Sequence, residues 1–320
     1  MKSRNLDIIT PFILMALFVL GRFIFPNKIT FITEVCIFTI YVMGNNILFG
    51  YLGYVSFGQP FYLGMGAYAA AIYLAYLGHN PLAAMLAAIL FGLLIGLILG
   101  PFFIRLRGDY FALVNAALCA IGIFIVEKVL INITRGDDGL WYRSRMHATP
   151  ILDIRLPNNF FYFMIIVLLI LLLLYRYMDK SVLGKSFRAT KINNRKMVFL
   201  GFSTFKIRWV GFILSVIFST FAGSLYAVNF GFVNPSLGEN SRAVEVLVAT
   251  LLGGSGTVYG PLAGALAFLG IKDLVSSWIT RWELVVGILT IVVLFKFSRG
   301  IWGSIEVLSN NLKKKFIKIS

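Results

Sequence analysis

The residues with the clearest potential for chemistry are a few ionisable side chains. Asp137 and Asp138 form an acidic pair of the kind that metal ions bind, and the two histidines, His79 and His147, lie far apart in the sequence. A protein metal site needs several converging ligands, so a single pair of acids or an isolated histidine is not enough. We interpret the acidic pair as part of a solvated loop or a protein-binding surface, and we expect the histidines to be isolated.

Covalent and nucleotide chemistry have no support either. The sequence has no arrangement of Ser, His and Asp, or of Cys and His, that suggests a nucleophile with its base. Cys36 and Cys119 lie in apolar segments and are interpreted as core residues. The sequence also lacks the phosphate-binding Gly-x-x-x-x-Gly-Lys-Ser/Thr motif. We therefore predict that the protein is not an enzyme and that this chain binds no cofactor or metal.

Apolar segments must position whatever functional groups the chain has. Hydrophobic residues make up 59% of the 320 residues and charged residues only 13%. Residues 35–104 form a run of 70 residues without a formal charge, and a helix of about 20 residues is enough to cross a bilayer core. The predicted fold class is an all-α polytopic membrane protein.

The apolar runs predict about ten transmembrane helices. They cover residues 8–26, 29–50, 61–78, 82–104, 110–132, 159–178, 207–228, 243–254, 261–275 and 283–298. Lys and Arg gather in alternate connectors, so the net charge of +16 reflects the positive-inside rule and not nucleic-acid binding.

This pattern predicts a multi-pass protein of the cell membrane with both termini in the cytoplasm. Residues 179–206 are then cytoplasmic, and residues 133–158 are extracytoplasmic. By domain, we expect a first transmembrane helix at 1–28, a main transmembrane domain at 29–300 and a basic cytoplasmic tail at 301–320.

Glu245 is the ionisable residue of most interest near a predicted span. A charge at the centre of a bilayer costs about 2.5–3.5 kcal/mol on insertion scales, so such charges pair or face water. Arg242 lies three residues earlier and would be on the same face of a helix. We expect the two to pair; a role for Glu245 in transport is the alternative.

Two glycine-rich stretches interrupt the apolar runs. They are GYLGYVSFGQPFYLGMGAY at 50–68 and LLGGSGTVYGPLAGAL at 251–266. Non-helical backbone at membrane depth is tolerated only where it is buried in protein or lines a watery cavity, and paired breaks in two halves of a chain mark a transport path. The alternative is that the glycines only allow helices to pack closely.

These stretches resemble the LivM-type branched-chain amino-acid ABC permeases. That family has Gly-Tyr-Ala-Gly-x-x-Ser-Leu-Gly-His followed by Gly-x-Gly-Ala-Tyr, and here Gln59 stands in place of the histidine. Further similar stretches, in the order of the family, are RLRGDYFALVNAAL (105–118), TRGDDGL (134–140), GKSFRATKINNRKMVFLGF (184–202), FAGSLYA, GFVNP and RGIWG. The matches run from about residue 44 to residue 303 and are specific only in combination.

The resemblance implies the permease subunit of an ATP-driven importer for branched-chain or related amino acids. It implies four kinds of partner: a second, homologous permease subunit, two cytoplasmic ATPase subunits that use ATP and Mg²⁺, an extracytoplasmic substrate-binding protein, and membrane lipid. No nucleic-acid partner is expected, and either a homodimer or a heterodimer of permeases fits. The alternatives are a permease for urea or short amides and, from another class, a self-contained secondary carrier.

Residues 184–202 mix basic and apolar side chains at roughly helical spacing. An amphipathic helix there can lie on anionic lipid, dock on a partner protein or be only a charged turn. The resemblance favours a coupling helix that inserts into an ATPase subunit. The residues expected to couple to the ATPase are Gly184, Arg188, Ala189, Ile192, Asn193, Asn194, Met197, Leu200 and Gly201.

The glycine-rich stretches provide the predicted substrate path. Hydroxyl and amide groups there can hydrogen-bond a zwitterion transiently, as a pore that must release its substrate requires. The expected path residues are Ser56, Gly58, Gln59, Gly64, Gly66 and Tyr68, with Gly253, Gly254 and Gly256 opposite.

Overall fold

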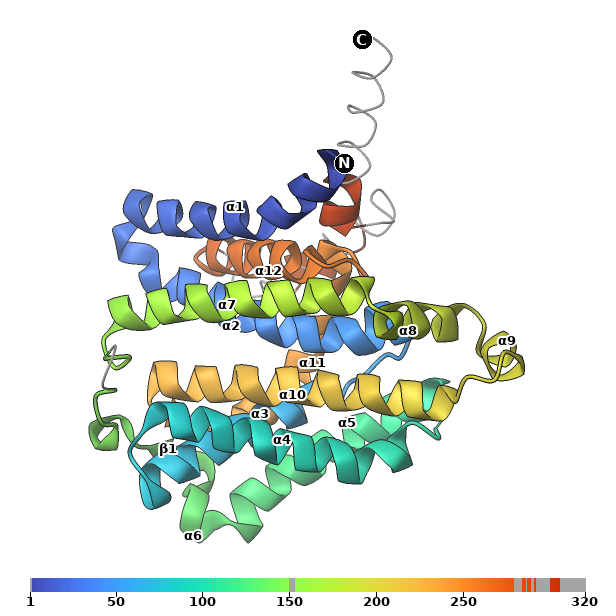
Figure 1. Cartoon of the computed structure of the whole chain (residues 1–320). Helices are drawn as coiled ribbons and strands as arrows, with labels where there is room; N and C mark the ends of the chain where they lie inside the picture. Colours follow the sequence, from blue (N-terminus) through green and yellow to red (C-terminus); the bar gives the residue numbers. More distant parts are fainter. Residues whose placement is uncertain are drawn as a thin grey trace.

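The computed structural model shows a bundle of long helices with short loops at its two ends (Figure 1). The structure describes residues 2–106, 108–149, 153–278, 284–285, 287–288, 291 and 300–305. Within these residues, six helical segments are long and apolar enough to cross a membrane: Pro26–Leu52, Gln59–Leu77, Pro81–Phe103, Gly108–Val129, Pro157–Lys180 and Thr204–Phe230. The predicted all-α class is therefore confirmed.

The long helices account for most of the predicted spans. They are α1 (Lys2–Ile24), α2 (Ile29–Asn46), α3 (Gln59–Ile72), α4 (Pro81–Phe103), α5 (Gly108–Phe124), α7 (Pro157–Lys180), α10 (Thr204–Phe230), α11 (Ser241–Gly253) and α12 (Gly260–Ser276). Each overlaps one of the first nine predicted spans. The tenth, 283–298, lies almost entirely outside the described residues, as does the tail from residue 306.

Shorter elements complete the ends of the bundle. Three π-helical segments continue α2, α3 and α5: η2 (Ile47–Leu52), η3 (Tyr73–Leu77) and η4 (Ile125–Val129). The short α-helices are α6 (Ile131–Thr134), α8 (Val182–Ile192) and α9 (Asn194–Phe199), and the 3-10 turns are η1 (Pro26–Lys28), η5 (Gly136–Asp138), η6 (Arg143–Arg145) and η7 (Pro235–Gly238). Strands β1 (Leu140–Trp141) and β2 (Phe232–Val233) pair antiparallel.

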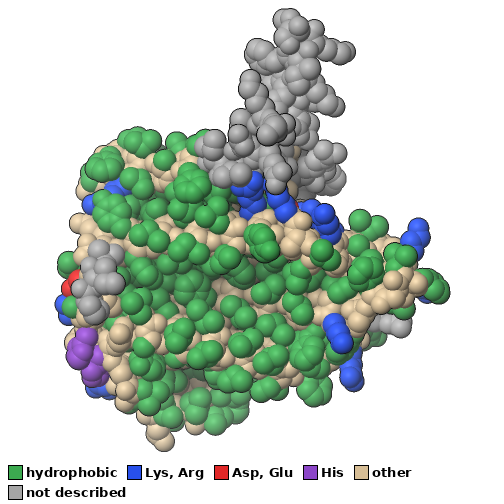
Figure 2. Space-filling view, viewed as in Figure 1, with side chains coloured by type: hydrophobic (Ala, Val, Ile, Leu, Met, Phe, Trp, Pro, Cys, Tyr) green, Lys and Arg blue, Asp and Glu red, His purple; other side chains and the backbone are tan. Residues whose placement is uncertain are grey.

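The outward faces of the long helices form an apolar belt. On α4, for example, Leu86, Leu94 and Ile98 are exposed, whereas Gly92, Gly96 and Gly100 are buried against α10. Figure 2 shows hydrophobic side chains over the face formed by α4, α7 and α10, with blue basic side chains mainly toward its edges. A belt of this extent would be unstable in water and is typical of a surface that faces lipid.

The two ends of the bundle differ in structure, and we name them by their elements. The α8 end carries α8 and α9, which project from the bundle at the right of Figure 1. The β1 end carries the β1–β2 ribbon, α6 and the loops around them.

The β1 end corrects one expectation from the sequence. The rings of His79 and His147 lie with their centroids 4.6 Å apart, and the His147 backbone N–H donates a hydrogen bond to the His79 carbonyl at 2.8 Å. The expectation that they are isolated is therefore wrong. It failed because a loop 68 residues further along the chain folds back onto the end of η3, a long-range contact that local sequence does not encode.

The predicted orientation can be tested by thiol labelling. In a background in which the buried Cys36 and Cys119 are replaced by serine, we expect Asp137→Cys to react with a membrane-impermeant maleimide on intact cells. Arg195→Cys, in α9, is expected to react only after the membrane is permeabilised, because the two exposed positions lie at opposite ends of a membrane-spanning bundle. Equal labelling of both on intact cells would contradict the predicted orientation.

Candidate functional site

The two glycine-rich breaks meet at the α8 end. Asn46, at the end of α2, accepts a hydrogen bond from the Gly256 N–H through its Oδ1 at 2.8 Å. Its Nδ2 donates to the Thr257 carbonyl at 3.1 Å and to the Tyr175 hydroxyl at 2.8 Å. One buried amide therefore joins α2 and α7 to the loop between α11 and α12.

Close backbone approach explains a glycine at this junction. A Cβ atom on Gly50 would lie 2.4 Å from the Gly256 nitrogen and 2.1 Å from the Asn46 Oδ1. The two breaks lie backbone to backbone here, and this close approach leaves no room for a side chain at position 50. The break at 254–259 thus contacts Asn46 and Gly50, whereas the residues of the first break that were predicted to line the path, 56–68, lie further along the chain.

Two basic side chains of α8 hold this junction, and we call them the α8 clasp. Arg188 forms an ion pair with Asp179, donates a hydrogen bond to the Gly256 carbonyl at 3.1 Å and lies 4.9 Å from the ring centroid of Tyr51. Lys191 donates through Nζ to the Gly50 carbonyl at 2.9 Å. The clasp therefore connects α8 to both breaks at once.

The environment of the clasp strengthens these contacts. Burial lowers the pKa of Lys191 below its usual range, because its ammonium group exchanges part of its water shell for backbone carbonyls. Asp179 also accepts a hydrogen bond from the Tyr51 hydroxyl at 2.7 Å, and its side chain is only 14% exposed. Charge-assisted hydrogen bonds in partly buried surroundings are stronger than those on an open surface.

Beyond the clasp, α8 and α9 carry an exposed apolar surface. Asn193 separates the two helices and caps α9, because its Oδ1 accepts a hydrogen bond from the Lys196 N–H at 3.0 Å. On both sides of this break, four apolar side chains point into solvent, and we call them the apolar tip: Ile192, Val198, Phe199 and Leu200. Basic residues flank the tip, as the blue and green atoms at the right of Figure 2 show.

The tip differs in part from the set of residues predicted to couple to the ATPase. Ile192 and Leu200 are exposed, at 84% and 72%, whereas Met197 is buried within the chain itself. Sequence analysis missed Val198 and Phe199, although the run Met-Val-Phe-Leu at 197–200 was a visible signal of an apolar patch. The remaining predicted coupling residues are placed as follows: Gly184 is buried, Ala189 and Asn194 are half-buried, and Asn193 and Gly201 are exposed.

Gln59 joins α3 to α10 through a buried polar network. Its Nε2 donates to the Ser215 Oγ at 2.9 Å, and its Oε1 accepts from the Ser219 Oγ at 2.6 Å. All three side chains are fully buried. A buried amide with both ends satisfied fixes the register of the two helices.

Gln59→Leu is expected to lower the stability of the chain, because it leaves the Ser215 and Ser219 hydroxyls without their partner. A buried polar group that loses its partner costs about 1–3 kcal/mol. Gln59→His is expected to cost less, because a neutral imidazole has one donor and one acceptor. Thermal unfolding of the purified protein in detergent measures both variants. A Gln59→Leu variant as stable as wild type would contradict the structural role of the network.

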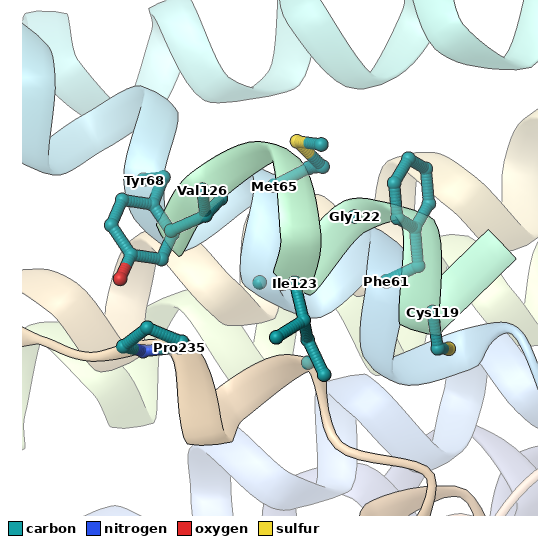
Figure 3. A pocket seen from close by; sticks show the side chains of 10 residues that line it. Phe61, Met65, Tyr68, Cys119, Gly122, Ile123, Val126 and Pro235 are labelled. Carbon is teal, nitrogen blue, oxygen red and sulfur yellow. The ribbon is translucent and has the colours of Figure 1, made fainter. Parts of the chain in front are cut away.

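A small cavity between α3, α5 and η7 contains two of the predicted path residues. Gly64 and Tyr68 line it, and its other walls are almost wholly apolar: Phe61, Met65, Cys119, Gly122, Ile123, Val126, Pro235 and Gly238. Figure 3 shows Phe61 and Tyr68 at opposite sides of the cavity, with Ile123 between them. The buried Tyr68 hydroxyl has no hydrogen-bond partner among the residues that the structure describes. The cavity has a volume of about 20 Å³, which is room for a water molecule beside this hydroxyl and too little for an amino-acid side chain.

The other predicted path residues lie in more tightly packed surroundings. A Cβ atom on Gly66 would lie 2.1 Å from the Thr220 carbonyl oxygen of α10, and one on Gly253 would lie 2.0 Å from that of Gly260. At these two positions the glycines allow helices to touch. Gly58 lies against Asn115 and Gly254 against Gly300, and the buried Ser56 hydroxyl is unpaired within the described residues.

Glu245 does not form its expected pair. Its carboxylate accepts a hydrogen bond from Lys272 of α12 at 3.0 Å, and Arg242 instead donates through Nε to the Ser236 carbonyl at 3.3 Å. The prediction of an Arg242–Glu245 pair is wrong, because packing of α12 beside α11 supplies a closer cation. Within the residues that the structure describes, no group of three or more His, Cys, Asp or Glu is placed to hold a metal ion.

Comparison with known proteins shows which proteins this chain resembles in sequence. The permease protein LivM of the high-affinity branched-chain amino acid transport system of Escherichia coli is 25% identical over 302 residues, which is 84% of this chain and 68% of LivM. The permease protein BraD of the corresponding system of Pseudomonas aeruginosa is 23% identical over 299 residues, which is 84% of this chain and 92% of BraD.

Shorter matches extend to another import system. The autoinducer 2 import system permease protein LsrC of Photorhabdus luminescens is 31% identical over 140 residues, 41% of this chain and 42% of LsrC. No solved structure matches this chain. Residues 27–294 match the family described as the branched-chain amino acid transport system permease component. The chain therefore belongs to the family of permease components of branched-chain amino acid transport systems.

Proposed function

We propose that this chain is the membrane subunit of an ATP-driven importer that moves branched-chain or related amino acids into the cell. The observation that carries the proposal is the α8–α9 projection, which exposes an apolar tip at one end and contacts both breaks of the membrane domain through the α8 clasp at the other. The permeases of this family are transport subunits and not enzymes. The sequence itself has no nucleotide-binding motif, so a separate ATPase must hydrolyse ATP.

In this proposal the α8 end faces the cytoplasm. The apolar tip docks on one ATPase subunit, and a second, homologous permease brings the other ATPase subunit. An extracytoplasmic binding protein delivers the amino acid at the β1 end. Closure of the ATPase pair moves α8, and the clasp transmits this movement to both breaks, so that the path changes from outward-facing to inward-facing.

The amino-acid substrate is supported by the relatives that match along most of the chain. LivM and BraD belong to branched-chain amino acid systems, whereas the match to LsrC of an autoinducer 2 system covers 41% of this chain. An importer of another small polar solute is the second candidate, and the match to LsrC is the observation in its favour.

Uptake by cells tests the proposal. A strain that lacks the gene for this chain is expected to lose ATP-dependent uptake of radiolabelled L-leucine, L-isoleucine or L-valine and to regain it on complementation. Labelled urea and autoinducer 2 serve as comparison solutes. Uptake that continues after ATP is depleted would indicate a secondary carrier, and loss of urea or autoinducer 2 uptake alone would assign a different substrate.

A further inference from the structure

A charged pocket lies toward the β1 end, where α2, α3, α10 and α11 meet. Its polar wall consists of Glu34, Tyr41, Tyr226, Arg242 and Glu245, and its apolar wall consists of Ile37, Phe38 and Leu63. The pocket thus places groups of both charges beside an apolar surface. It is separate from the cavity beside Tyr68, which has almost no polar lining.

The polar groups of this charged pocket are not all satisfied by the protein. Tyr41 is 1% exposed, and its hydroxyl has no hydrogen-bond partner in the described part of the chain. A buried hydroxyl without a partner is unfavourable and calls for an explanation, such as a ligand that it binds. It is an observation independent of the charges around it.

Partners elsewhere in the protein hold two of the charged side chains, Arg242 and Glu245. Arg242 donates through Nε to the Ser236 carbonyl. Glu245 is held by Lys272, and Glu34 lines the pocket from α2. The arrangement therefore places one guanidinium and two carboxylates around a single space.

We propose that the charged pocket binds the α-ammonium and α-carboxylate groups of an aliphatic amino acid during transport, an inference that rests on the proposed function. Arg242 and the Tyr41 hydroxyl hold the carboxylate, because a guanidinium and a hydroxyl are both donors to an anion. Glu34 and Glu245 hold the ammonium group. Ile37, Phe38 and Leu63 contact the aliphatic side chain.

The pocket is narrow in this structure, so a whole amino acid enters only when its walls separate. The walls belong to different helices: Glu34 and Tyr41 lie on α2, and Arg242 and Glu245 lie on α11. Alternating access requires such helices to change their spacing. We place the pocket near the end where, under the proposed function, the binding protein releases its ligand.

Binding of defined probes to the membrane complex tests the inference. The complex is purified without the binding protein, placed in lipid nanodiscs and dialysed against labelled L-leucine. Two competitors each lack one charge: isoamylamine has no carboxylate, and 4-methylpentanoate has no ammonium group. We expect each to bind at least about tenfold more weakly than L-leucine, because a lost charge-assisted hydrogen bond leaves its partner unpaired.

The variants have opposite expected signatures. Arg242→Gln should weaken binding of L-leucine and 4-methylpentanoate by about tenfold or more and leave binding of isoamylamine unchanged. Glu34→Gln should weaken binding of L-leucine and isoamylamine and leave binding of 4-methylpentanoate unchanged. Tyr41→Phe removes only a hydroxyl and should weaken L-leucine without disturbing folding. Asp273→Asn is the matched control, because its ion pair with Lys28 at 2.6 Å lies at the same end of the bundle but does not line the charged pocket.

The outcomes separate this inference from the proposed function. Equal L-leucine binding by wild type, Tyr41→Phe, Arg242→Gln and Glu34→Gln would show that these side chains only stabilise the packing of the bundle and do not bind the amino acid. Absence of L-leucine binding to a complex that supports ATP-dependent leucine uptake in cells would overturn the pocket and leave the function intact. Conversely, absence of leucine uptake by cells that contain the complex would refute the proposed substrate. This holds even if the purified complex binds leucine and the variants change probe binding as expected.

Discussion

Phe199→Asp is expected to abolish ATP-dependent uptake by releasing the ATPase from the membrane complex. Phe199 lies at the end of α9 with its side chain 89% exposed, beside the exposed Leu200. Such a projecting aromatic residue is a typical interface anchor, and loss of an anchor costs about 2–4 kcal/mol. That range is about 30- to 1,000-fold in the dissociation constant. An aspartate costs more than truncation, because its charge would be buried without a partner.

Co-purification of the ATPase with the tagged chain measures this effect directly, and uptake of labelled L-leucine measures its consequence. Phe199→Leu is the control, because it keeps an apolar side chain at the tip and should retain most of the binding. Insertion into the membrane should be normal in both variants, since α9 lies outside the apolar belt. If the tip instead lies on lipid, Phe199→Asp will weaken membrane-dependent activity while the ATPase still co-purifies.

The helices of the bundle could be predicted because each one leaves a local record in the sequence. An uncharged run as long as 81–103 is long enough for a span by itself, and α4 is found there. The glycine-rich breaks could also be recognised from the composition of the sequence. The contacts that they make could not be predicted, because the contact between Asn46 and Gly256 joins residues 210 positions apart.

The errors in the predicted site have the same origin. Arg242 was the nearest cation to Glu245 along the helix, so a local rule selected it, but Lys272 on the neighbouring helix is the partner found in the structure. Met197 was included among the expected coupling residues on the assumption of one continuous amphipathic helix. Asn193 interrupts that helix and caps α9, which rotates Met197 toward the chain and leaves Val198 and Phe199 outside. Asparagine is a preferred capping residue, so this signal was present but ambiguous.

The α8 clasp leads to a further prediction, which does not follow from docking of the ATPase on the apolar tip. Arg188→Ala is expected to leave the ATPase bound while reducing uptake by about tenfold or more, because it removes the contact between α8 and the second break. The lost interactions are the ion pair to Asp179 and the hydrogen bond to the Gly256 carbonyl. Hydrogen bonds to charged groups contribute about 1.5–3 kcal/mol each. ATP hydrolysis should continue, so the expected result is uncoupling.

The measurement compares ATP hydrolysis and L-leucine uptake in the same proteoliposomes, with ATPase co-purification as the check on assembly. Arg188→Lys keeps the charge but not the guanidinium geometry that brings Nη2 to both the Asp179 carboxylate and the Gly256 carbonyl, so its coupling should be intermediate. Lys191 still holds the first break in both variants, which is why we expect the bundle to stay folded. Loss of the ATPase from Arg188→Ala would place this residue in the docking surface. Normal uptake would show that movement of α8 reaches the path by another route, since within the described part of the chain Arg188 is the charged side chain that joins α8 to the Gly256 carbonyl.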